Sequence, residues 1–407
     1  MEKKRIALII GFLIVAAALG YALYRVFFAQ PKIATIPGAP SATTTRPTPQ
    51  EFPETATGVR GAIAPGGVTL PTAPGRGVGE EGTRAAARRV AAVTNDPIRG
   101  ASADATGALR FYSDQDGKFY RIGRDGTVTL LNDTVFYNVE RVTWAPAGSA
   151  SILEYPDGSN IYYNFDSKRQ VTLPKHWQDF SFDTTGTKIA AKSLGLSPDN
   201  RWLVTANAEG TDVTLVEPLG ENASRVAVDW SPNNQIVALS RTGEPLGADR
   251  QQVIPIGLHG ENFRALTVEG RDLRSQWSPD GRRLLYSVYN AASNYKPELW
   301  IDAALGDTIG TDRRLLSVNT WADKCTFAGE RYVYCGVPET LRVGAGLAPS
   351  SADFTPDRLF RIDLDSGVRT EVPMSEEHVI DTIFTEDSGQ TIYFTDKRTS
   401  GVYRVDL

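Results

Sequence analysis

The stretch Ser275-Gln-Trp277-Ser-Pro-Asp-Gly281, followed by the run Leu284-Leu-Tyr-Ser-Val288, carries the main indication of the fold. Two further stretches repeat its order of residue types: Val142-Thr-Trp144-Ala-Pro-Ala-Gly148 and Val228-Asp-Trp230-Ser-Pro-Asn-Asn234. In the complete copy an aromatic residue precedes a turn in which Pro fixes φ and Gly tolerates a positive φ. The run after the turn is continuously apolar, as a strand buried on both faces requires.

Weaker copies of the same unit keep the register along the chain. They lie at 101–107, 180–186, 325–329 and 383–389. The copies are spaced roughly 40–60 residues apart, which is the period of a propeller blade. A third strand and a polar fourth strand follow, for example Leu359-Phe-Arg-Ile-Asp363 and Arg369-Thr-Glu-Val372. The sequence therefore predicts an all-β fold, a seven-bladed β-propeller over residues 83–407.

The Trp-Ser-Pro-Asp-Gly turn, the β-run after it and the Ile-Asp-Leu-like third strand resemble the WD-type propeller repeat of TolB-like proteins. The resemblance covers about residues 84–407. It implies a propeller and an exported location. It implies no particular ligand, because propeller repeats occur in many binding modules and as accessory domains of peptidases.

The last repeat supplies only three strands, the third being Val402-Tyr-Arg-Val-Asp406. A sheet that stopped there would present an open edge. The segment Arg88-Arg-Val-Ala-Ala-Val93 resembles a fourth strand, and we expect it to close the ring beside the C-terminal strands. The alternative is a short helix over 83–93, because Ala and Arg are good helix formers.

The N-terminus carries the signature of a membrane anchor. Residues 6–28 are apolar except for Tyr21, Tyr24 and Arg25, and a spanning helix needs about 20 such residues. The basic residues among 1–5 keep that end in the cytoplasm. The sequence thus predicts a single-pass membrane protein whose C-terminal domain is extracytoplasmic, in the periplasm or at the cell surface. A cleaved signal peptide is the alternative, although Phe27-Phe28-Ala29 puts a bulky ring where cleavage favours a small residue.

Residues 29–82 are rich in Pro, Thr and Gly and contain few aromatic residues. Such a segment buries too little apolar surface to offset the entropy of ordering it. We expect a disordered or extended spacer that holds the propeller away from the membrane. Binding of the cell wall by this tract is the alternative reading.

Charge and composition exclude several function classes. The formal net charge of the 407-residue chain is -5, without a basic block beyond its first residues, so nucleic acid is not an expected partner. Three histidines and two cysteines give little material for a transition-metal site. No motif for a catalytic nucleophile, a zinc protease or a cofactor is present. We therefore predict no metal, no cofactor and no catalytic residue.

Two smaller features have structural interpretations. Cys325 and Cys335 fall on predicted adjacent antiparallel strands, which predicts a disulfide in an exported protein. Two buried free thiols are the alternative. The Asp114-Gln-Asp116-Gly117 and Asp363-Leu-Asp365-Ser-Gly367 segments resemble the start of calcium loops but lack the later Glu ligand, so hairpin turns are favoured.

Three expanded connections, at 242–251, 290–297 and 336–355, belong to consecutive blades and should cluster on one rim. Loops on a rigid scaffold are where binding residues concentrate. The candidates in and beside them are Tyr289, Asn290, Tyr295, Lys296, Arg241 and Arg342. Neutral drift of exposed loops is the alternative explanation for their length.

Two functions fit this organisation. The first is a binding or scaffold module that engages a protein or a cell-envelope polymer. The second is a propeller enzyme, a lyase or a hydrolase, with its active site in the central channel. An apolar patch on the long-loop rim would favour binding, whereas titratable side chains converging on the channel would favour an enzyme.

Overall fold

The structure is a computed structural model that describes residues 15, 18–19, 21, 87–104, 106–385 and 389–407. The chain divides into two compact units, Met1–Gly79 and Glu80–Leu407. The predicted anchor at 6–28 and the predicted spacer at 29–82 fall almost entirely outside the described residues. Within the described residues, no helix is long and apolar enough to cross a membrane.

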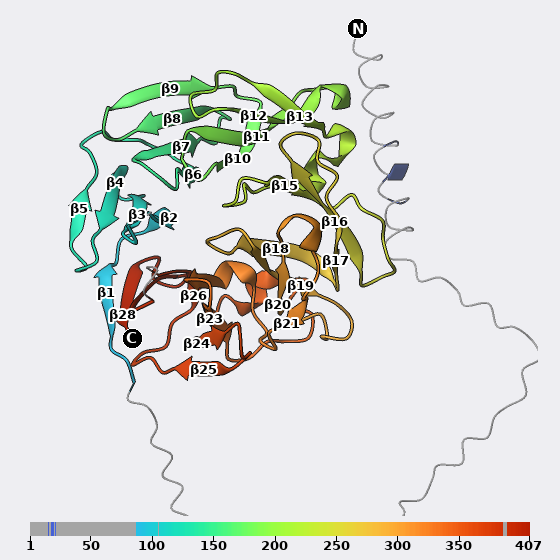
Figure 1. Ribbon diagram of the computed structural model, residues 1–407. Coiled ribbons are helices and arrows are strands. Elements are labelled where there is room, and N and C mark those ends of the chain that lie inside the picture. The colour runs from blue at the N-terminus through green and yellow to red at the C-terminus, as the bar shows by residue number, and fades with distance from the viewer. Residues whose placement is uncertain (1–14, 16–17, 20, 22–86, 105, 386–388) are drawn as a thin grey trace, which may run out of the picture. The chain divides into compact units, whose positions relative to one another are not determined.

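The second unit is a seven-bladed β-propeller, as the repeats predict. Its described residues form seven four-stranded antiparallel sheets, and Figure 1 shows them arranged as a ring. Within most sheets the strands follow chain order from the axis outward. The first strands of neighbouring blades contact one another, for example β2 with β6 and β6 with β10, so they lie nearest the axis.

The strand bounds are as follows. Blade 1 contains β2 (Ile98–Ala103), β3 (Leu109–Ser113), β4 (Lys118–Ile122) and β5 (Val128–Leu130). Blade 2 contains β6 (Arg141–Trp144), β7 (Ala150–Glu154), β8 (Asn160–Asn164) and β9 (Arg169–Leu173). Blade 3 contains β10 (Trp177–Phe182), β11 (Lys188–Leu194), β12 (Arg201–Asn207) and β13 (Thr214–Pro218). Blade 4 contains β14 (Val226–Val228), β15 (Ile236–Ser240), β16 (Gln251–Gly257) and β17 (Leu266–Val268).

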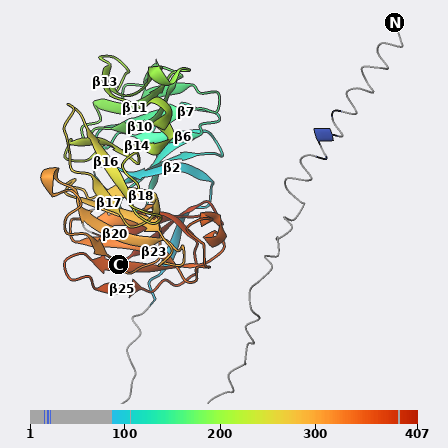
Figure 2. The ribbon, with the colours of Figure 1, turned by 90° about the vertical axis from the view of Figure 1, so that its right-hand side faces the viewer.

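Blade 5 contains β18 (Arg271–Trp277), β19 (Arg283–Tyr289), β20 (Glu298–Ala303) and β21 (Arg314–Leu315). Blade 6 contains β22 (Cys325–Ala328), β23 (Tyr332–Pro338), β24 (Asp357–Asp363) and β25 (Arg369–Val372). Blade 7 contains β26 (Ile380–Thr385), β27 (Thr391–Asp396), β28 (Val402–Asp406) and the N-terminal β1 (Val90–Thr94). Short 3-10 helices are η1 (Pro198–Asn200), η2 (Gly220–Arg225), η3 (Gly306–Thr308), η4 (Ala322–Lys324) and η5 (Pro349–Ala352). Figure 2, turned by 90°, shows the blades from green β13 to red β25 following one another along the ring.

The repeated turn joins the first and second strand of a blade and is held by its own side chains. In blade 5, Ser278 Oγ accepts a hydrogen bond from the backbone N–H of Arg283 at 3.0 Å and donates one to Asp280 at 2.7 Å. Gly281 has a φ of +68°, a conformation that a side chain would strain. This geometry explains why the Ser-Pro-Asp-Gly sequence marks a blade so clearly.

In blades 2 and 4 the aromatic residue before the turn packs against the preceding blade. Trp144 of blade 2 donates its indole N–H to the carbonyl of Gly100 in blade 1 at 2.6 Å. Trp230 of blade 4 lies in a buried cluster with Leu203 of blade 3. Buried clusters that combine residues of neighbouring blades show that the core runs between the blades.

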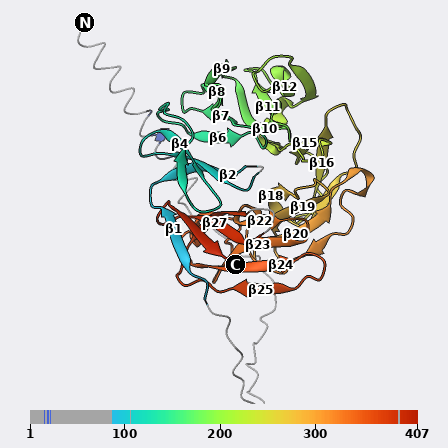
Figure 3. The same ribbon diagram turned by 60° about the vertical axis from the view of Figure 1, so that its left-hand side comes forward.

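The ring is closed by the N-terminal strand. β1 pairs antiparallel with β28, with Val90 opposite Val405 and Thr94 opposite Val402 (Figure 1). Figure 3 shows β1 beside the sheet that contains β27. The strand interpretation is therefore confirmed over the helical one. The strand begins two residues later than predicted, because Arg88 instead forms a parallel bridge to Met374.

Candidate functional site

Three long loops connect the second to the third strand in blades 4, 5 and 6. They span 241–250, 290–297 and 339–356, and the last contains η5. The blade 6 loop begins later than the predicted 336, because β23 continues to Pro338 and pairs there with Asp357.

The loops of blades 5 and 6 are joined through their backbones. The N–H of Gly346 donates to the carbonyl of Tyr295 at 2.7 Å, and that of Gly344 donates to Asn294 at 2.9 Å. A Cβ on Gly346 would stand 2.5 Å from the ring of Tyr289, so only glycine allows this approach. The loops therefore form one docked surface.

The blade 4 loop joins the same surface through a weaker contact. The N–H of Ala291, in the blade 5 loop, donates to Asp249 Oδ2 at 3.4 Å. Arg271, at the start of β18, donates to the carbonyl of Ala248 at 2.8 Å. All three loops thus lie on one side of consecutive blades.

The structure brings four of the predicted site residues together around the blade 5 loop. The rings of Tyr289 and Tyr295 meet edge to face with centroids 6.4 Å apart. Asn290 is buried, donates its amide to the carbonyl of Glu269 at 2.6 Å and accepts from the N–H of Ser293, so it braces the loop. Lys296 is half-buried.

The two predicted arginines lie apart from this group. Arg342 is exposed on the blade 6 loop. Arg241 is half-buried, and its guanidinium donates to the carbonyl of Ser224 at 3.3 Å, within its own blade. Arg241 therefore supports the start of its loop, whereas Arg342 faces solvent.

The residue-level prediction named Tyr295 but missed three exposed aliphatic residues on the same loops. Exposed apolar side chains stand on the three loops: Val343 is 73% exposed, Leu347 61%, Leu246 40% and Tyr295 39%. We call these four residues the rim patch. Val343 and Leu347 flank Gly344 and Gly346, whose N–H groups bind the blade 5 loop at Asn294 and Tyr295. Exposed apolar side chains that lie on joined loops are typical of an interaction surface. The expansion of the loops was the signal that could have identified them.

Charged side chains near the axis are paired between blades. Arg141 on β6 contacts Asp179 on β10 at 3.0 Å, and the buried Lys192 contacts the same carboxylate at 2.6 Å. Arg274 on β18 contacts Asp323 of η4 at 2.7 Å. The Arg141–Asp179 pair joins blades 2 and 3, whereas Lys192 and Asp179 lie within blade 3. These charged groups near the axis are therefore held in ion pairs.

Perturbed carboxyls occur at separate places in the propeller. Burial raises the pKa of Glu154, at the end of β7, despite the nearby Arg141. Burial also raises the pKa of Asp302 on β20 to about 7. Asp302 contacts Tyr286 at 3.3 Å inside blade 5. The two carboxyls therefore do not combine into an acid–base pair.

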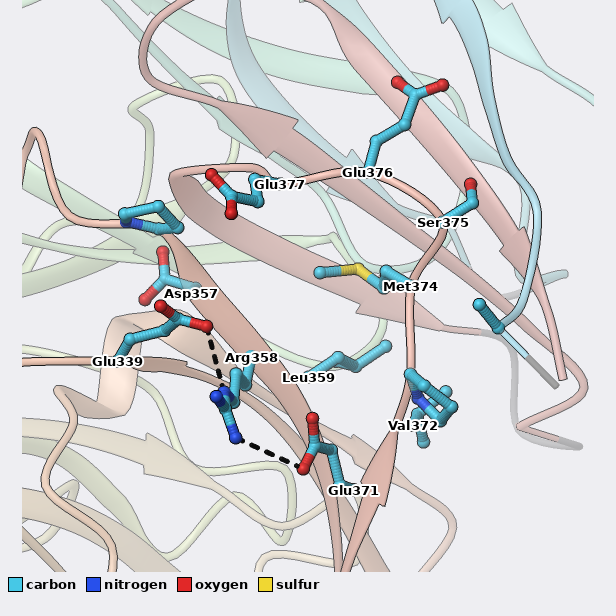
Figure 4. A pocket seen from close by; sticks show the side chains of 13 residues that line it. Glu339, Asp357, Arg358, Leu359, Glu371, Val372, Met374, Ser375, Glu376 and Glu377 are labelled. Carbon is cyan, nitrogen blue, oxygen red and sulfur yellow. Dashed lines mark hydrogen bonds and ion pairs between the residues drawn. The ribbon is translucent and has the colours of Figure 1, made fainter. Parts of the chain in front are cut away.

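A hollow of about 790 Å³ lies beside the closing strand, between blades 6 and 7 (Figure 4). Several carboxylates line it, but Arg358 lies between Glu339 at 3.0 Å and Glu371 at 3.6 Å. Asp357 is buried and paired with Lys324 at 2.7 Å. Part of the acidic lining is thus neutralised by its own partners, while Glu376 and Glu377 are exposed at the same hollow.

Cys325 and Cys335 face each other across the β22–β23 pair and form a disulfide. Asp114–Gly117 and Asp363–Gly367 are the hairpin turns after β3 and β24. No group of three or more His, Cys, Asp or Glu side chains in the described part of the chain is arranged to hold a metal ion.

The sequence matches no protein-family model and no curated protein. Solved structures, by contrast, are similar over most of the chain. An oligogalacturonate lyase in complex with manganese aligns with a TM-score of 0.54 at 14% identity, over 78% of this chain and 93% of that one. The β-propeller domain of Cps50 (Swd1) from Myceliophteria thermophila aligns with a TM-score of 0.53 at 10% identity, over 78% of this chain and 98% of that one.

The tricorn protease aligns with a TM-score of 0.50 at 11% identity, over 79% of this chain and 34% of that one. A lyase, a WD-type domain and a protease thus share one architecture with this chain. At these identities the likeness extends to the fold alone. The chain is a seven-bladed β-propeller whose function must be argued from its own surface.

Proposed function

We propose that this protein is a binding module that captures a protein partner through the rim patch. The observation that carries the proposal is the exposure of Val343 and Leu347 on a loop docked by backbone hydrogen bonds. A docked loop loses little entropy on binding, and exposed apolar side chains on a rigid scaffold are typical of interface centres.

A protein partner fits this surface better than a cell-envelope polymer does. Val343, Leu347 and Leu246 are aliphatic, so they offer apolar burial rather than flat rings on which sugars stack. Exposed Arg342 stands next to Val343 and supplies a charged group at the edge of the patch. Apolar centres with an Arg nearby are common in protein–protein interfaces.

The proposal includes a place for the protein in the cell. The apolar run at 6–28, preceded by Lys3, Lys4 and Arg5, supports a single-pass anchor with the propeller on the extracytoplasmic side. The Pro-rich tract after it supports a spacer role. A propeller held at a distance from a bilayer can present its rim patch to a partner in the cell envelope.

The proposal can be tested with a photo-crosslinking amino acid in the full chain, expressed in cells. It is placed at 343 or 347 in two variants and at Val368 in the control. Val368 is 58% exposed, in the turn between β24 and β25. We expect one discrete protein adduct from both rim positions and none from 368. The same adducts from all three positions, or none from the rim, would contradict the proposal.

A further inference from the structure

A second concave surface lies on the same side of the propeller, across blades 7, 1 and 2. It consists of two hollows, of about 740 and 1010 Å³, and Arg99 lines both. Figure 3 shows β2, which carries Arg99, between β6 and the sheet of blade 7. We call the two hollows together the blade 7–1–2 groove.

Arg99 is fixed within the groove and is not a free cation. Its guanidinium binds Asp114 through two nitrogens, at 3.2 and 3.0 Å, and donates to the carbonyl of Glu140 at 3.2 Å. The hydrogen bond and charge of Asp114 raise the pKa of Arg99. The guanidinium is thus neutralised by a partner and held in one orientation.

Acidic side chains outnumber basic ones along the groove. The lining carries the carboxyls of Asp114, Glu140, Asp157, Asp353, Asp381 and Asp396 against the cations of Arg99, Lys397 and Arg398. Most of these carboxyls already have partners. Lys397 is paired with Asp353 at 2.8 Å and Asp381 at 3.5 Å, and Lys175 is paired with Asp157 at 3.3 Å. Asp396 is buried and contacts His378 at 2.8 Å. Among the described residues, no ion pair reaches the exposed carboxylate of Glu140. Glu140 is therefore the lining carboxylate that is open to pairing with a positively charged ligand.

Exposed aromatic rings flank these carboxylates. Tyr137 is 75% exposed beside Glu140, and Phe354 is 84% exposed where the other hollow ends. Tyr155 adds a half-buried ring to the same hollow as Tyr137. The face of an aromatic ring attracts a guanidinium or ammonium group, and a nearby carboxylate adds an ion pair.

We propose that the blade 7–1–2 groove binds an extended, arginine- or lysine-bearing polypeptide segment. Its two adjoining hollows suit a chain that runs over the surface, with cationic side chains between the rings and the carboxylates. An acidic polysaccharide would be repelled by the same lining. Asp353 and Phe354 belong to the blade 6 loop, which also carries part of the rim patch. The test is independent of that patch, because Tyr137 and Glu140 lie in the connection between blades 1 and 2.

The test uses the full chain and three fluorescein-labelled repeat peptides, of Gly-Ser-Arg, Gly-Ser-Gln and Gly-Ser-Glu, measured by fluorescence anisotropy. We expect the Arg peptide to bind, the other two not to bind, and the affinity to fall with added salt. Glu140→Gln should weaken binding about two- to fivefold, the effect of one partly exposed ion pair. Tyr137→Ala should weaken it by a similar factor, about two- to fivefold.

The matched control is Glu244→Gln, an exposed carboxylate on the blade 4 loop, which should leave the affinity unchanged. Both groove substitutions are at exposed positions, so circular dichroism should show unaltered folding. Three results would overturn the inference: equal binding of the Arg and Glu peptides, no effect of either groove substitution, or binding of a labelled neutral oligosaccharide in place of the Arg peptide.

Discussion

Ring closure by β1 makes a quantitative prediction. Val90 is buried in the cluster that joins blades 6 and 7, opposite Val405, whereas its neighbour Ala91 is exposed opposite Arg404. Val90→Asp would place a carboxylate inside that cluster. Ala91→Asp would place the same carboxylate in solvent, beside a guanidinium, and is the matched control.

The cost can be worked from the contacts. Val90→Asp loses the burial of a valine side chain, about 1.5–3 kcal/mol, and buries a polar group that lacks a partner. Deletion of β1 loses more, because the ladder to β28 and the bonds of Arg88 to Pro373 and Ser375 disappear with it. At about 1 kcal/mol for each hydrogen bond, the deletion costs on the order of 5–10 kcal/mol. That rivals the whole stability of a domain, about 5–15 kcal/mol.

The assay is thermal unfolding followed by circular dichroism. A chain beginning at Asp96 should aggregate, or have a melting temperature far below that of a chain beginning at Gly82. The melting temperature of Val90→Asp should lie between those of the two chains. Ala91→Asp should have the same melting temperature as the unmodified chain. If the chain from Asp96 were as stable as the chain from Gly82, or if both aspartates had equal effects, β1 would not close the ring.

Three further predictions follow from single sites. Cys325→Ser should lower the free energy of unfolding by about 1–3 kcal/mol, and mass spectrometry without reductant should show no free thiol at Cys335 in the unmodified protein. Asp302 has a folded pKa of about 7, above its unfolded value, so its contribution to the free energy of unfolding is lost as pH rises from about 4 to 7. Asp302→Asn should remove that pH dependence of the free energy of unfolding, measured by urea titration. An unchanged pH profile in the variant would refute the assignment to Asp302. In Gly346→Val the new side chain should collide with the ring of Tyr289 and separate the blade 6 loop from the blade 5 loop. Amide hydrogen exchange should then become faster at 290–297 and 339–356 and nowhere else. Unchanged exchange would contradict the docking of the two loops.

The fold was predictable because each blade repeats one local device. The Trp277 turn needs particular residues at fixed positions, so even degenerate copies such as 180–186 can be located by register. The closing strand was predictable by counting strands, since three strands in the last repeat require a fourth. The first residue of the closing strand was not predictable. It depends on the bridge between Arg88 and Met374, which is far from Arg88 in the sequence.

The candidate site was predictable in place but not in detail. Loop length located the rim, but the docking of Gly344 and Gly346 on the neighbouring loop is a tertiary contact with no local signature. For the same reason sequence reasoning chose Asn290 as an exposed contact, although the structure uses its amide to brace the loop. The exposure of Val343 and Leu347 became visible only once the loop was placed.

The central claim, that the rim patch captures a protein, is tested most directly by a charge placed in it. Leu347→Asp and Val368→Asp change equally apolar, comparably exposed positions on different sides of the propeller. The measurement is the affinity of each full-length variant for the partner recovered by crosslinking. The account predicts a loss of about five- to thirtyfold for Leu347→Asp and no change for Val368→Asp. Equal affinities for the two variants would contradict it.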